Sequence, residues 1–109
     1  MTGMDAVEKQ VEAFNARDLD AFVACYTREA VIEDADGGVQ MGRDEIRKSY
    51  GELFESRPNL RAEIQSRIRV GSYVVDEEEV SGLTDGDFHA IAIYTLDHGG
   101  FIGRVRVLR

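Results

Sequence analysis

The chain has 109 residues, a length that suits one domain, 1–109, with its own core. Hydrophobic residues make up 43% and charged residues 31%, a globular balance that excludes a disordered chain. A formal net charge of -8 argues against nucleic acid as a partner, because the phosphate backbone would be repelled. No apolar segment is long enough to span a membrane and no apolar signal core is seen, so we expect a cytoplasmic protein with no membrane partner.

Metal-binding side chains are few and scattered. Cys25 is the only cysteine, which excludes an internal disulfide, and His89 and His98 lack the spacing of zinc ligands. We therefore predict no metal site and no cofactor.

Two helices and a short strand are predicted at the start of the chain. Apolar residues at helical spacing predict a first helix over 4–16. Asp18 is a typical cap for a second helix over Leu19–Tyr26. Ala30–Asp34 then favours a strand, and a glycine-rich turn allows 39–41 to pair back on it.

A third helix and a long strand follow. The helix begins after Gly42, carries one apolar stripe, and ends at Pro58, the only proline. From Leu60 to Val70 apolar and polar residues alternate, which predicts a strand with one dry and one wet face.

The last part of the chain predicts an antiparallel meander. Asp85-Gly86 is a strong hairpin signal, and glycine-containing turns also lie at 71–72 and 97–100. The strands that they separate are 73–83, 88–96 and 101–108. The fold class is therefore α+β, with three helices on one face of a curved antiparallel sheet.

The strand over 88–96 is apolar on both faces. One face can meet the helices, but the other needs a second cover, because monomers rarely expose large apolar patches. A homodimer packed sheet to sheet is the cover we favour, and a terminal segment of the chain itself is the alternative.

Two segments resemble a known family. They are VEAFNARDLDAFVACYTREAVIEDADG followed by GRDEIRKSY, and Ala90 to Arg106. Both are similar to the nuclear transport factor 2-like superfamily, and most of all to its ketosteroid isomerase and polyketide cyclase branch. The resemblance implies a cone-shaped fold, a curved sheet wrapped around the helices with a pocket at the open end. It covers isomerases, cyclases, dehydratases, an epoxide hydrolase and non-catalytic binding modules, so the fold does not fix the function.

The resemblance places the general base of the isomerases at Asp34. Those enzymes combine an Asp base with an oxyanion hole of one Tyr and one protonated Asp. An Asp at a strand end that faces an apolar cone would be partly desolvated, which raises its pKa toward a useful range. The alternative is a turn aspartate that is exposed to solvent.

The two oxyanion donors of the isomerases are replaced in this chain. The tyrosine position holds Gln10, and the protonated Asp position holds Ala92, which has no donor. Loss of one such donor typically costs about 10²–10³ in rate. The resemblance therefore does not predict an efficient steroid isomerase.

Other polar side chains are expected around the pocket. Tyr26 and Tyr50 match aromatic positions near the family pocket, and Tyr94 lies two residues from Ala92 on the same face of its strand. For each tyrosine the alternative is a core position with its hydroxyl at the surface. The run 77–79 of three glutamates is interpreted as a solvated strand edge.

Two functions from different classes remain open at this stage. In the first, Asp34 removes a proton from a small apolar substrate bound by Gln10, Ala92 and the three tyrosines, in an isomerase, cyclase or dehydratase. In the second, the same fold is a non-catalytic ligand-binding module or dimer scaffold.

Overall fold

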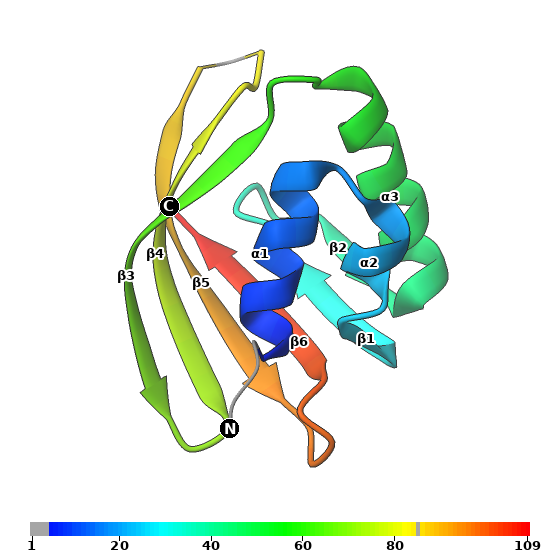
Figure 1. Ribbon diagram of the computed structural model, residues 1–109, viewed down its shortest axis with the longest axis vertical. Coiled ribbons are helices and arrows are strands. Elements are labelled where there is room, and N and C mark those ends of the chain that lie inside the picture. The colour runs from blue at the N-terminus through cyan, green and yellow to red at the C-terminus, as the bar shows by residue number, and fades with distance from the viewer. Residues whose placement is uncertain (1–4, 85) are drawn as a thin grey trace.

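The computed structural model describes residues 5–84 and 86–109, and it forms a curved sheet around helices (Figure 1). The helices are α1 (Ala6–Ala16), α2 (Leu19–Val23) and α3 (Gly42–Ser56). The strands are β1 (Tyr26–Glu33), β2 (Val39–Met41), β3 (Arg61–Val70), β4 (Tyr73–Ser81), β5 (Phe88–Leu96) and β6 (Ile102–Leu108). The predicted α+β cone is confirmed. Within the described residues no helix is long and apolar enough to cross a membrane.

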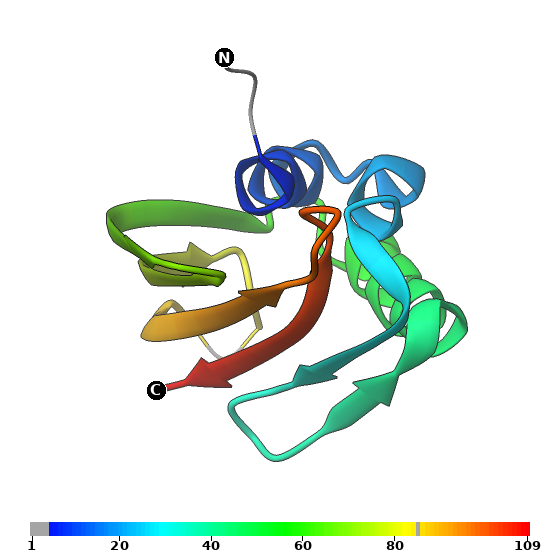
Figure 2. The same ribbon diagram turned by 90° about the horizontal axis from the view of Figure 1, so that it is seen from below.

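The six strands form one sheet in the order β2-β1-β6-β5-β4-β3. The sheet curls so that α1 lies inside its concave face, and α3 covers the end near β1 (Figures 1 and 2). The strands from β3 to β6 form the predicted antiparallel meander. The pair of β1 and β6 is parallel, which the prediction of a wholly antiparallel sheet missed. The hairpin signal at Asp85-Gly86 includes Asp85, which lies outside the described residues, but β4 and β5 do pair as its two arms.

The first two helices begin after capping aspartates, of which Asp18 is the one predicted from the sequence. Asp5 forms a capping box with Glu8, and the Asp18 side chain accepts a hydrogen bond from the backbone N–H of Ala21 at 3.2 Å. The second helix ends at Val23, not at Tyr26 as predicted. Tyr26 begins β1 and pairs with β6, so strand pairing overrides the helical periodicity of this segment.

Strand β3 departs from its predicted two-faced pattern at a β-bulge. The register against β4 shifts between Ile64 and Ser66, so the side chains that follow exchange faces. Arg67 then points inward, while Ile68 and Val70 are 60% and 66% exposed on the outer face. The prediction of one dry face over the whole strand is therefore wrong beyond the bulge.

Candidate functional site

A pocket of about 540 Å³ opens between α3 and the ends of the strands. One part of its wall is apolar and is formed by Phe14, Leu53, Leu60, Val80, Leu83 and Phe88. Asp34, Tyr50 and Glu78 bring polar groups to the same space, and further charged side chains, among them Glu52, Arg57 and Arg109, also line it. An apolar wall with polar groups beside it can bind a small molecule and fix its orientation.

A smaller cavity of about 60 Å³ lies deeper in the cone. It is bordered by Gln10, Tyr26, Ala92 and Tyr94, and it shares Tyr50 and Glu78, among other residues, with the outer pocket. The small volume could hold about two water molecules at ~30 Å³ each, or one polar head group of a ligand. The body of any larger ligand must therefore lie in the outer pocket.

Asp34 stands at the rim of the outer pocket. It follows the last residue of β1, and its backbone closes the turn through hydrogen bonds with Gly37 and Gly38. Its side chain is partly buried and accepts a hydrogen bond of 2.8 Å from Nε2 of Gln40. Burial raises the pKa of the Asp34 carboxyl, and the hydrogen bond from Gln40 partly opposes that rise. Asp34 is thus a half-buried residue of the turn that also lines the outer pocket.

Gln10 links two tyrosines at the floor of the cone. The Tyr26 hydroxyl donates to Oε1 of Gln10 at 3.3 Å, and Nε2 of Gln10 donates to the Tyr94 hydroxyl at 2.8 Å. Burial raises the pKa of both tyrosines, so both hydroxyls stay protonated. Because the Tyr94 oxygen already accepts from Gln10, its own hydrogen is free to donate to a group in the inner cavity.

Tyr50 lies between the two hollows. Its ring packs against Phe22 with 4.7 Å between ring centroids, in a cluster that also contains Phe14 and Phe54. Burial raises the pKa of the Tyr50 hydroxyl, and the nearby carboxylates of Asp34 and Glu78 add to the rise. Among the described residues no hydrogen bond is made by this hydroxyl, so it remains available to a ligand.

Glu78 is a site residue that the sequence interpretation missed. It was assigned to a solvated edge with its two neighbours, but its side chain lines both hollows. Burial, followed by the charge of Asp76, raises the pKa of Glu78 from its ordinary value of 4.5 to about 7. The alternation of β4 could have revealed it, because Val74 and Val80 fix the inward face and Glu78 shares their parity.

Asp76 shares the inward face of β4 but is not available to a ligand. Its carboxylate is fully buried and is held by Arg67 through two hydrogen bonds, Nε to Oδ1 at 2.6 Å and Nη2 to Oδ2 at 2.8 Å. Such a bidentate pair neutralises the charge in place. Of the two inward carboxyls of this strand, only Glu78 reaches the pocket.

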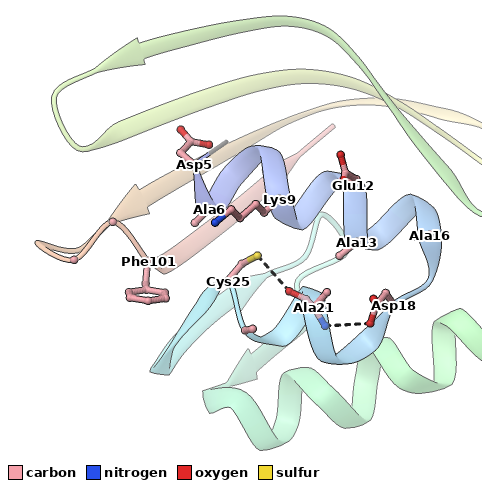
Figure 3. Close-up of a pocket in the computed structure, with 13 residues that line it drawn as sticks. Asp5, Ala6, Lys9, Glu12, Ala13, Ala16, Asp18, Ala21, Cys25 and Phe101 are labelled. Atoms are coloured by element: carbon pink, nitrogen blue, oxygen red, sulfur yellow. Dashed lines mark hydrogen bonds between the residues drawn. The ribbon is translucent and has the colours of Figure 1, made fainter. Parts of the chain in front are cut away.

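A second large hollow, of about 610 Å³, lies on the outside of α1 and α2 (Figure 3). Much of its wall comes from small residues such as Ala13, Ala21 and Gly99. The carboxylates of Asp5 and Glu12 point away from Cys25, whose thiol donates to the backbone carbonyl of Ala21 at 3.3 Å (Figure 3). None of the polar residues predicted for the site lies here.

Comparison with known proteins supports the fold. The sequence profile of the SnoaL-like domain family matches residues 7–105. A search of the curated proteins gives no match.

Solved structures share the fold over almost the whole chain. A cystatin-fold protein from Novosphingobium aromaticivorans is 30% identical, with a TM-score of 0.87 over 98% of this chain and 100% of that one. A proposed polyketide cyclase from Sinorhizobium meliloti is 21% identical, with a TM-score of 0.84 over 94% and 92% of the two chains. A protein of ketosteroid isomerase-like fold from Catenulispora acidiphila, solved with trimethylamine, is 19% identical, with a TM-score of 0.80 over 99% and 87%.

Proposed function

We propose that this chain, which belongs to the SnoaL-like domain family, is a cofactor-independent enzyme that moves a proton on a small apolar substrate. Asp34 is the general base, and it removes a proton next to a carbonyl or a hydroxyl group. Isomerisation, cyclisation and dehydration all begin with such a step. The observation that carries the proposal is a partly desolvated carboxyl that lines a pocket with one apolar wall, with its pKa raised by burial.

The substrate-binding residues of this proposal are the polar groups of the inner cavity and its neck. Tyr94 and Gln10 present donors at the floor, Tyr26 fixes the orientation of Gln10, and Tyr50 offers a hydroxyl between floor and rim. Ala92 contributes only a methyl group there. A neutral phenol and amide stabilise an oxyanion less than a carboxylic acid does, so steroid isomerisation at high rate is not expected from these groups alone.

The test is proton exchange at carbon, because exchange needs no knowledge of the final product. Small ketones such as cyclohexanone and 3-cyclohexenone are incubated in D₂O, and proton NMR follows the loss of the signal next to the carbonyl. Wild-type protein should accelerate exchange, and Asp34→Asn should reduce the rate about 10²–10⁴-fold. Glu55→Gln on the exposed side of α3 is the matched control and should keep the wild-type rate. An Asp34→Asn variant with an unchanged rate would refute the role of Asp34.

The second candidate is a non-catalytic ligand-binding module of the same fold. It is favoured by Ala92 and Gln10 at the two donor positions of the resembled isomerases, and by the use of the Gln10 amide to hold Tyr26 and Tyr94. In that case ligands bind equally well to wild type and to Asp34→Asn, and the wild type gives no exchange above background.

We also propose that the outer face of the sheet forms a homodimer. Exposed apolar side chains gather on the strands from β3 to β6, among them Ile68, Val70, Ile91 and Leu108. Sedimentation velocity should show a dimer for wild type and a monomer for Ile91→Lys. Val39→Lys changes an exposed apolar side chain on β2, at the far edge of the sheet, and should leave the dimer intact.

A further inference from the structure

Glu78 lies at the floor of the site near Ala92, whose side chain has no hydrogen-bond donor. Ala92 and Glu78 border the same cavity of about 60 Å³, together with Tyr94 and Gln10. They stand on the paired strands β5 and β4, where Glu78 is opposite Ala90 and Asp76 is opposite Ala92. The methyl group of Ala92 leaves space that a longer side chain from β4 can reach.

We propose that the carboxylic acid of Glu78 donates a hydrogen bond to the developing oxyanion of the substrate, in place of the acid that the resembled isomerases carry at the position of Ala92. This inference rests on the proposed function of Asp34 as the base. Glu78 is then a catalytic residue, and Tyr94 is the second donor at the same oxygen.

The two carboxyls are placed for different tasks. Strands β6 and β5 separate β1 from β4 in the sheet, so the backbones near Asp34 and Glu78 are roughly three strand spacings, about 14 Å, apart along it. The Asp34 carboxylate accepts a hydrogen bond from Gln40, and a bound substrate would bridge Asp34 and Glu78. Tyr50 lines the outer pocket together with both carboxyls, and it lines the inner cavity together with Glu78.

The proton balance closes without another reactant. Asp34, in its carboxylate form, takes a proton from carbon, and the electron pair of the broken C–H bond moves toward the carbonyl oxygen. The protonated Glu78 shares its O–H proton with that oxygen or transfers it, which gives an enol, a protonated Asp34 and an ionised Glu78. Return of the proton from Asp34 to carbon, and of the enol proton to Glu78, restores both groups.

The environment keeps Glu78 protonated in part at neutral pH. The titratable groups that face it are Asp76 on β4, Tyr94 on β5, Tyr50 on α3 and Tyr26 on β1. The mouth of the outer pocket adds Asp34, Asp36, Glu52, Asp87, Arg57 and Arg109. Burial is the first cause of the raised pKa of Glu78, and the charge of Asp76 is the second. The two histidines do not line either hollow, and His89 pairs with Glu77 on the outer face at 2.7 Å.

The experiment measures binding of 4-nitrophenolate, an oxyanion whose ionisation is read from its visible absorbance. It is done in the Asp34→Asn background, so that the charge of the base does not contribute and no turnover is needed. If the phenolate binds only when Glu78 is protonated, its dissociation constant should rise about 50-fold between pH 7 and pH 9. Glu78→Gln in that background should make the constant nearly independent of pH. Glu79→Gln, the neighbour on the opposite face of β4, should keep the wild-type profile.

Three results would overturn the inference. They are an unchanged pH profile in Glu78→Gln, failure of the phenolate to bind at pH 6, and a Glu78 pKa below about 5 in a carbon-13 NMR titration of the wild type. The last measurement needs no variant, so it stands even if Glu78→Gln fails to fold. An Asp34→Asn variant with full exchange activity would contradict the proposed function alone, because the binding assay does not depend on it.

Discussion

Replacing Glu78 by Gln should change the stability of the protein in a way that depends on pH. Folding raises the pKa of this carboxyl from about 4.5 to about 7, so the native state holds the proton more tightly than the unfolded state. The stability associated with the group is therefore complete below pH 4.5 and is lost as the pH rises through 7. Gln has nearly the same shape as Glu and never ionises, so the Glu78→Gln variant does not lose this stability as the pH rises.

The magnitude follows from the two pKa values. A rise of roughly 2.5 pH units at 1.36 kcal/mol each corresponds to about 3 kcal/mol when the group is fully ionised. Between pH 5 and pH 8 the advantage of Glu78→Gln over wild type should grow by about 2.5 kcal/mol. Water that enters the open pocket lowers this figure, so it is an upper value.

Urea unfolding followed by far-UV circular dichroism is the suitable assay, because the chain has no tryptophan. A difference of this size shifts the midpoint by roughly 1 M or more. Other groups that titrate in the same way in the variant and in the wild type do not affect the difference between their free energies of unfolding. For the control Glu79→Gln, this difference should not vary with pH. If the difference between Glu78→Gln and wild type is the same at pH 5 and pH 8, the desolvation argument for Glu78 is wrong.

Three further predictions concern stability and are checked by the same unfolding assay at pH 7. Asp76→Asn removes the buried carboxylate that Arg67 holds and leaves Glu8, at 4.0 Å, as the remaining anion near the guanidinium, which should cost about 3–5 kcal/mol. Gly82→Ala should destabilise the protein by more than about 2 kcal/mol, because φ is +86° and the added Cβ would lie 2.2 Å from a backbone oxygen. Gly71→Ala, where φ is +58° and the space is open, should cost only about 1 kcal/mol. Equal costs for the two variants would contradict the steric argument. Asn15→Ala removes a side chain that bonds both backbone groups of one β3 residue, at 2.9 and 2.7 Å, and should cost about 1–3 kcal/mol; a loss below 0.5 kcal/mol would show that water replaces it.

Local periodicity predicts much of this fold, and its failures have identifiable causes. The capped start of α1 and the turn at 71–72 follow from side-chain chemistry within a few residues. Tyr26 was assigned to a helix because its apolar spacing is helical, yet its place in the sheet depends on β6, which lies more than seventy residues later. The parallel pairing of β1 with β6 is non-local in the same way, so no short window contains its signal.

Only part of the candidate site was predicted from the sequence. Gln10, Tyr26, Tyr50, Ala92 and Tyr94 border one cavity, and Asp34 lies on the adjoining pocket. Their roles in binding and catalysis stay proposals. Glu78 was missed because three consecutive glutamates look like a solvated surface, although a strand turns every second one to the opposite face.

The bulge in β3 links the inside of this protein to its outside. One additional residue, near Gln65, turns Arg67 inward to meet Asp76 and turns Ile68 outward. If the same residues formed a strand without the bulge, Ile68 in place of Arg67 would face the inside of the sheet. The ion pair with Asp76 would then be lost, and Ile68 and Val70 would leave the apolar patch proposed for dimerisation. One bulge in β3 thus determines both which side chain lies inside the cone and which apolar side chains a second copy could meet.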